Sequence, residues 1–215
     1  MIGVKFGFMH SYDFFNLILN SKEIGMPEIK RNVIEIPGAD GNTDLTYVFD
    51  NEAKFKNRTL KFNFTINPAI GVANYMKTYS NMCVILHGTQ RKIILDDDPD
   101  YFYSGIIDVG GYKCEKGIAT FEITCDCEPF KTENAATVVS QVVNGTATVS
   151  LYNSRKRVVP EITADTELLI KFNNITHQLF EGTTIIPELE LKNGSNIIEV
   201  TGVGNISFSY QKGRL

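Results

Sequence analysis

The sequence predicts an all-β protein, mainly β with one short helix, built from two domains. Val, Ile, Thr, Phe and Tyr dominate the chain, and these residues favour strands. Several segments alternate polar and apolar side chains, which is the pattern of a half-buried strand. Clusters of Gly, Pro and Asn separate these segments. The 215 residues are enough for two domains that each bury a core.

The first 45 residues contain an ambiguous apolar run and a loop. Residues 12–19 are apolar over a short length, which fits either a strand or a buried helix. Residues 37–42 are a loop by composition, because proline restricts φ while Gly and Asn accept positive φ.

Two segments of the N-terminal part alternate as strands do. Residues 61–66 and 120–127 each place every second, apolar side chain on one face, and we expect that face to be buried. The two faces comprise Phe62, Phe64 and Ile66 in the first segment and Phe121, Ile123, Cys125 and Cys127 in the second.

One helix is predicted over residues 69–81. Asn67 offers an N-cap and Pro68 a first-turn proline. An apolar stripe at helical spacing follows, made of Val72, Tyr75, Met76 and Tyr79. This stripe is our candidate for an oligomer interface. Packing within its own domain is the favoured alternative, because helices normally bury their stripe there.

Residues 96–100 predict a turn between strands at 91–95 and 101–109. The segment consists of Asp and Pro, which favour turns. Positions 96, 98 and 100 also match the start of an EF-hand calcium loop. However, Tyr101 stands where that loop needs Gly, and Ile107 where it needs Glu. Further turns are predicted at 110–111, 144–145 and 193–194, the last two being Asn-Gly pairs typical of hairpins.

A domain boundary is predicted near residues 128–135, which divides the chain into 1–131 and 132–215. Pro129 ends a strong strand because proline cannot donate to a central ladder. Residues 136–215 then resemble a run of short strands with turns about every ten residues, typical of a small β-sandwich. One of these strands, residues 205–210, would bury Ile206, Phe208 and Tyr210.

Charge and hydropathy exclude several classes of partner. The net charge is −4 and the pI about 5.4, so binding to nucleic acid is not expected. No apolar stretch reaches the roughly 20 residues of a membrane helix, so membrane insertion is not expected. Residues 1–6 lack the pattern of a secretory signal, and the four cysteines are expected to be reduced.

No pattern of catalytic, cofactor-binding or metal-binding residues stands out. His10, His87 and His177 are not part of an HExxH motif, and no Ser occupies a Gly-x-Ser-x-Gly elbow. A Ser-His-Asp or Cys-His group assembled in space from residues distant in sequence remains an alternative, although nothing local in the sequence argues for it. The spacing of Cys125 and Cys127 suits a strand better than a zinc site. The residues therefore favour a structural or binding protein with no cofactor over an enzyme.

Several segments, taken in order, resemble the distal tail (Dit) proteins of long non-contractile-tailed bacteriophages. The resemblance covers nearly the whole chain. It is carried by IPGADGNTDLT (36–46), LKFNF (60–64), LHG (86–88), KIILDDDPDYFYSG (92–105), ATFEITCDCEPFK (119–131), GSNII (194–198) and FSYQKGRL (208–215).

This resemblance implies an N-terminal β-sandwich that assembles into a hexameric ring at the tail tip of the virion. The ring would join the tail tube to the baseplate or to receptor-binding proteins, after synthesis in the host cytoplasm. It also implies a C-terminal galectin-like β-sandwich outside the ring that serves as a docking platform. The chain has no Trp and no obvious long insertion in its C-terminal part. Both observations point to a form that mainly builds the hub, and binding to host wall sugar is possible but not favoured.

Two alternatives to a structural hub remain. The first is a carbohydrate-binding module that recognises host cell-wall polysaccharide through the C-terminal sandwich, using an exposed tyrosine such as Tyr152 or Tyr210. The second is a wall hydrolase with paired carboxylates, but no pair of carboxylates is singled out by the sequence.

Overall fold

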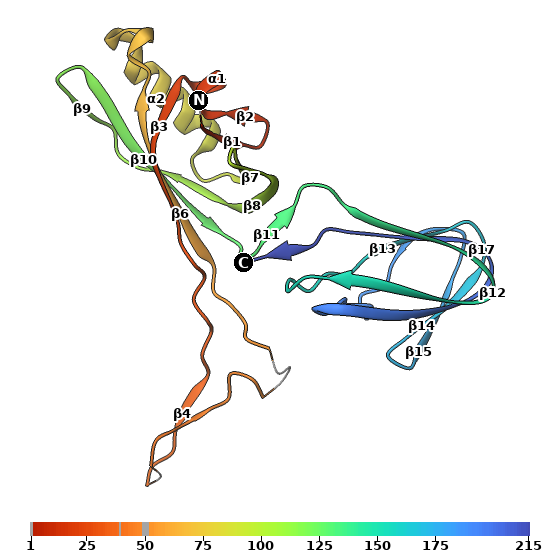
Figure 1. The fold of residues 1–215 in the computed structure, drawn as a ribbon. Helices are drawn as coiled ribbons and strands as arrows, with labels where there is room; N and C mark the ends of the chain where they lie inside the picture. The colour runs from red at the N-terminus through yellow and green to blue at the C-terminus, as the bar shows by residue number, and fades with distance from the viewer. Residues whose placement is uncertain (1, 39, 49–51) are drawn as a thin grey trace. The chain divides into compact units, whose positions relative to one another are not determined.

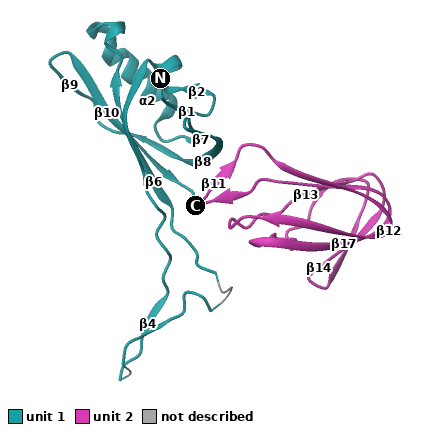
Figure 2. Cartoon of the chain, in the orientation of Figure 1, with its two compact units in different colours: residues 1–129 teal, residues 130–215 magenta. Residues whose placement is uncertain are grey.

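A computed structural model describes residues 2–38, 40–48 and 52–215. Ala39, within the predicted loop 37–42, lies outside the described residues. The chain divides into two compact units, Met1–Pro129 and Phe130–Leu215 (Figure 2). The sequence placed the division after residue 131. In the structure, Lys131 belongs to the second unit, where β11 (Lys131–Glu133) pairs with β18 (Gly213–Arg214).

The first unit is built on one antiparallel sheet (Figure 1), in agreement with the predicted all-β class. Along the sheet, the strands follow the order β2-β1-β7-β8-β10-β6-β3, and β9 pairs with β10. Their bounds are β1 (Val4–Phe6), β2 (Met9–His10), β3 (Leu17–Ile24), β6 (Arg58–Ile66), β7 (Gln90–Leu95), β8 (Asp98–Val109), β9 (Lys113–Glu115) and β10 (Ile118–Cys127).

The sheet of the first unit curls around its core. The predicted apolar faces of residues 61–66 and 120–127 are confirmed, because their alternate side chains are all buried in β6 and β10. Phe6 of β1 lies against Phe62 and Phe64, with ring centroids 6.2 and 6.5 Å apart. Since β7, β8 and β10 separate β1 from β6 in the sheet, the two strands meet only because the sheet curls. The alternate apolar side chains of strands from both ends of the curled sheet therefore form the two sides of this core.

Residues 12–19 combine the two structures that the sequence left open. They begin in α1 (Ser11–Phe15) and continue in β3. Asn16 lies between them in the left-handed region, with φ 54°, and its N–H donates to the carbonyl oxygen of Tyr12 at 2.9 Å. Asn tolerates this conformation better than most residues, so it ends the helix after little more than one turn.

The predicted helix over residues 69–81 is wrong at both ends. Asn67 caps only a 3-10 turn, η1 (Pro68–Ile70), by accepting the N–H of Ala69. Gly71, with φ +80°, interrupts the chain before η2 (Val72–Asn74), and the helix proper is α2 (Tyr75–Leu86). The helix runs to Leu86 because the buried side chains continue there.

The turn at the aspartates is confirmed, whereas the one at Gly110 is not. Asp96 and Asp97 alone close the β7–β8 hairpin, and β8 starts earlier than expected, at Asp98. The N–H of Gly110 donates to the carbonyl oxygen of Glu122 at 2.7 Å, so β8 and β9 run along the same edge of β10. Glycine is needed at 110 for close approach, since a Cβ there would lie 2.9 Å from that oxygen.

The second unit contains two strands far longer than the sequence predicted. β12 (Thr137–Asn153) and β17 (Gly194–Tyr210) pair along their whole length. The Asn-Gly pair at 144–145 therefore lies inside a strand and makes no hairpin. Gly145 and Gly202 face each other across this ribbon with φ of 93° and 141°, so the glycines bend it. The Asn-Gly pair at 193–194 is a bend that leads into β17.

These bends fold a single sheet into the predicted small sandwich. The first part of β17 pairs with β14 (Leu168–Phe172), and its last part pairs with β13 (Glu161–Ala164). Two outer strands, β15 (Ile175–Leu179) and β16 (Gly182–Ile185), complete the sheet. The core between the layers includes Ile206, Phe208 and Tyr210, as expected for residues 205–210.

Gly204 should be more sensitive to substitution than Gly145. Its φ is +157°, and a Cβ there would lie 2.1 Å from Thr166 Oγ1 and 2.6 Å from Asp165 Oδ1. We expect Gly204→Ala to lower the free energy of unfolding by about 1–3 kcal/mol. Gly145→Ala has unfavourable φ but no atom within 4 Å of the added Cβ, so it should cost less. Urea unfolding of both variants tests the order, and equal costs would contradict it.

Candidate assembly surface

A long arm leaves the first unit between β3 and β6 (Figure 1). We define the arm as the described residues between 25 and 57. Near its tip, β4 (Val33–Glu35) pairs with β5 (Asn42–Asp44). The two sides are joined by backbone hydrogen bonds of 2.7–2.9 Å from Gly25 to Thr59, Lys56 to Glu28, Lys30 to Lys54 and Leu45 to Asn32. The arm is therefore an ordered two-stranded ribbon.

The arm exposes an unusual number of apolar side chains. No described residue of the arm belongs to the hydrophobic core of the unit. The exposed apolar residues of the arm are Met26, Ile29, Val33, Ile34, Ile36, Tyr47 and Val48, which are 40–72% exposed. Isolated apolar residues on a surface are ordinary, but a ribbon that carries them along its length is typical of an interaction surface.

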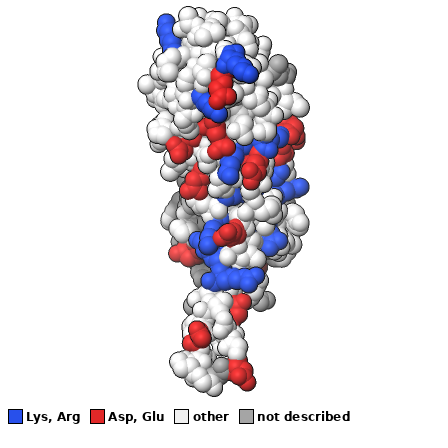
Figure 3. Space-filling view, turned by 90° about the vertical axis from the view of Figure 1, so that its left-hand side faces the viewer, with Lys and Arg blue, Asp and Glu red and all other residues white. Residues whose placement is uncertain are grey.

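The arm also carries charges of both signs. In Figure 3, basic side chains lie nearer its root and acidic side chains toward its tip. At the root, Lys56 Nζ donates to Glu28 Oε2 at 2.9 Å, and this hydrogen bond lowers the pKa of Glu28. Both side chains are exposed, so the pair adds little to stability. Mixed charges of this kind favour a protein partner over nucleic acid.

The predicted interface residues of the helical segment are split between two environments. Tyr75 is buried and Tyr79 half-buried, and their hydroxyls donate to the carbonyl oxygens of Gly117 and Gly110 at 3.2 and 2.9 Å. Val72 and Met76 are 60% and 54% exposed. The structure therefore places Tyr75 and Tyr79 against their own sheet and leaves Val72 and Met76 open to a neighbour.

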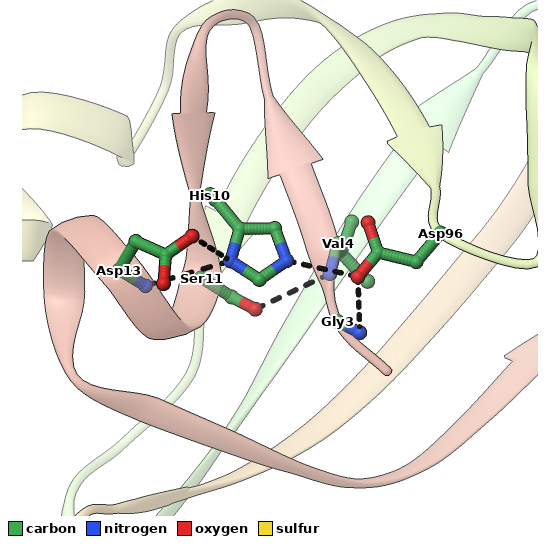
Figure 4. Close-up of polar contacts among 6 residues, drawn as sticks. All are labelled: Gly3, Val4, His10, Ser11, Asp13 and Asp96. Carbon is green, nitrogen blue, oxygen red and sulfur yellow. Dashed lines mark hydrogen bonds and ion pairs between the residues drawn. The ribbon is translucent and has the colours of Figure 1, made fainter. Parts of the chain in front are cut away.

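His10 is the centre of a polar cluster that ties the N-terminal segment to the β7–β8 turn (Figure 4). Its Nε2 lies 2.9 Å from Asp96 Oδ2, and its Nδ1 lies 3.1 Å from Asp13 Oδ2. Asp96 also accepts the N–H of Gly3 at 2.8 Å, while the buried Ser11 hydroxyl accepts a backbone N–H of β1. Both ring nitrogens face carboxylates and neither faces Ser11. The cluster is thus a structural clamp without the geometry of a Ser-His-Asp triad.

Asp96 should make the fold sensitive to acid. Burial opposes its charge, but hydrogen bonds from His10 and Gly3 outweigh burial and lower the pKa of Asp96. A lowered pKa means that the carboxylate stabilises the fold above about pH 4 and that this contribution is lost as the pH falls. We expect Asp96→Asn to cost about 1–2 kcal/mol at pH 7 and much less at pH 3. Urea unfolding at both pH values checks this, and an equal loss would contradict it.

The cysteines and aspartates that the sequence raised as metal ligands have other surroundings. Cys125 and Cys127 are buried in β10, and burial raises the pKa of the Cys127 thiol to about 12. Asp96 is engaged with His10, and Asp97 with Lys22. Within the described ranges, no three His, Cys, Asp or Glu side chains gather as a metal site would require. No helix in these ranges is long and apolar enough to cross a membrane.

Comparison with known proteins gives a match in structure alone. No family model and no curated protein matches the chain. Among solved structures, the crystal structure of the SPP1 Dit protein (gp 19.1) matches 100% of both chains with a TM-score of 0.76, at 14% sequence identity.

The chain has the Dit fold. The predicted resemblance is therefore confirmed at the level of the fold, over both units. The SPP1 Dit protein is described as a paradigm of the hub adsorption apparatus in phages that infect Gram-positive bacteria. In this Dit fold, the arm is the feature that sequence reasoning missed.

Proposed function

We propose that this protein is a structural component of a phage tail tip, in which six copies form a ring. The ring would connect the tail tube to the baseplate or to receptor-binding proteins. The observation that carries the proposal is the arm, which is an ordered ribbon with apolar side chains outside the core of its own unit. The match to the SPP1 Dit fold supports the same role.

An arm of this kind is compatible with a ring, in which each copy places its arm on the next copy and not reciprocally on one partner. The arm and the surface that it covers on a neighbour are different parts of the chain, so each copy offers one and receives the other. Such a heterologous contact makes a closed ring when its rotation closes. Exposed Val72 and Met76 supply a second apolar surface near the helix, and the Tyr75 and Tyr79 hydroxyl contacts hold that helix in place.

In this proposal the two units have different tasks. The first unit forms the ring, and the second is a galectin-like platform outside it that docks receptor-binding components. The protein acts by assembly and not by catalysis, in keeping with the match to the SPP1 Dit fold. It would be made in the host cytoplasm and function at the tail tip of the virion.

Crosslinking from the arm tests the proposal. A photo-crosslinking residue replacing Val33 should join neighbouring copies in a ladder that ends at six subunits. The matched control replaces Val203 of β17, which is also exposed, and should give no regular ladder. Crosslinks that stop at the dimer, or that arise only within one chain, would contradict the ring.

A further inference from the structure

The outer face of the second unit carries a row of hydroxyl side chains across four strands. The strand registers align Ser140 with Ser207, Ser207 with Thr163 and Thr163 with Thr183. The hydroxyls of Thr163 and Thr183 are 3.0 Å apart, and both residues are exposed. This row lies on the face opposite the core, since the neighbouring residues Ile162 and Ile206 are buried.

Part of this row lines a hollow, which we call the trough. On one side, the trough is bordered by Asn205, Asp165 and Glu181. The hollow has a volume of about 380 Å³, and it is lined by Ser140, Thr163, Ala164, Asp165, Glu181, Gly182, Asn205, Ile206 and Ser207. This volume lies within the range of small-ligand sites.

Asp165 and Asn205 form a rigid polar pair at the border of the trough. Asp165 Oδ1 accepts the backbone N–H of Asn205, and Oδ2 accepts its side-chain Nδ2–H, both at 2.6 Å. These hydrogen bonds, the backbone one foremost, lower the pKa of Asp165, so its carboxylate is charged at neutral pH.

We propose that this trough binds a neutral or amino-substituted saccharide. Ser and Thr hydroxyls both donate and accept, as sugar hydroxyls do, and carboxylate and amide groups side by side bind neighbouring sugar hydroxyls. The lining contains Asp165 and Glu181 but no Lys, Arg or His, so a phosphate-bearing or acidic glycan would be repelled. The polar row disfavours an apolar protein segment as the occupant. This site is independent of the proposed ring.

The site differs from the aromatic platform that the sequence suggested for carbohydrate binding. Tyr210 is buried, and its hydroxyl donates to the carbonyl oxygen of Tyr152 at 2.8 Å. Tyr152 is exposed, but it is not among the residues that line the trough. The proposal therefore places recognition on hydroxyls and carboxylates.

An array of neutral, amino-substituted and acidic oligosaccharides of two to six sugars, probed with the full-length protein, tests the site. Binding should be confined to neutral and amino sugars. Thr163→Phe, which fills the trough, and Glu181→Gln, which removes a charged acceptor, should each weaken the strongest binding about tenfold or more. Titration calorimetry with the best oligosaccharide measures the change.

Thr146→Phe is the matched control. Thr146 is an exposed strand threonine that faces Thr201 across β12 and β17, as Thr163 faces Thr183, but it does not line the trough. It should bind sugar as the unmodified protein does, and thermal unfolding should show all three variants folded. No binding across the array, preference for acidic glycans, or equal binding by Thr163→Phe would overturn the proposal. Any of these outcomes would leave the crosslinking and mass measurements of the ring unchanged, so the two proposals can fail separately.

Discussion

Replacing Val33, Ile34 and Ile36 by serine should abolish the ring while leaving both units folded. The three side chains are 45–48% exposed and lie outside the core, so their loss costs the isolated chain little. In a ring they would be buried against a neighbour, and full burial of one such side chain is worth about 1.5–3 kcal/mol. Three losses at every contact therefore lower the affinity between neighbours by orders of magnitude.

Gel filtration with light scattering, together with a urea unfolding curve, measures this effect. The control carries serine at Leu169, Ile175 and Val203 of the second unit, which are 45–68% exposed. It should assemble as the unmodified protein does. If the arm variant still formed rings, the arm would not be the assembly surface, and if it failed to unfold cooperatively, the loss would reflect misfolding.

Phe64→Ala should destabilise the first unit more than the substitution of any exposed side chain. Phe64 is fully buried in β6, and its ring contacts those of Phe6, Phe62 and Phe121 at centroid distances of 6.0–6.5 Å. Removing a buried phenylalanine ring typically costs about 3–5 kcal/mol. Because Phe64 joins β1, β6 and β10, its loss opens the core where the curled sheet meets itself.

Denaturation in urea, followed by tyrosine fluorescence, measures the cost of Phe64→Ala. Phe8→Ala is the control, since Phe8 is 83% exposed and its removal should change the free energy of unfolding by less than about 0.5 kcal/mol. A loss below about 1 kcal/mol for Phe64→Ala would show that the core relaxes around the cavity and would contradict tight packing of these rings.

The parts of the fold that could be predicted are those set by local alternation. Phe62, Phe64 and Ile66 repeat at every second position, so the buried face of β6 follows from sequence alone. The structural role of a glycine was harder to predict, because a positive φ occurs both in turns between strands and in bends within a strand. Gly145 bends a strand opposite Gly202, and that partner is distant in sequence.

The predictions for the helix and for the arm failed for different physical reasons. Val72 and Met76 share the spacing of Tyr75 and Tyr79, but Gly71 and the 3-10 turns rotate Val72 away from the stripe of α2. The inward face is set by the sheet below, which sequence periodicity does not contain. The arm has no core of its own, so its apolar residues need match no period, and only the structure shows that they are exposed.

Light scattering after gel filtration of the full chain, with negative-stain images of the peak, tests the central claim most directly. A ring of six copies would have a mass six times the 24.1 kDa of one chain and would appear as ring-shaped particles. The measurement should be made over a range of protein concentrations, because ring assembly depends on concentration. A stable dimer with two-fold symmetry, or a monomer at every concentration tested, would contradict a ring built by the arm.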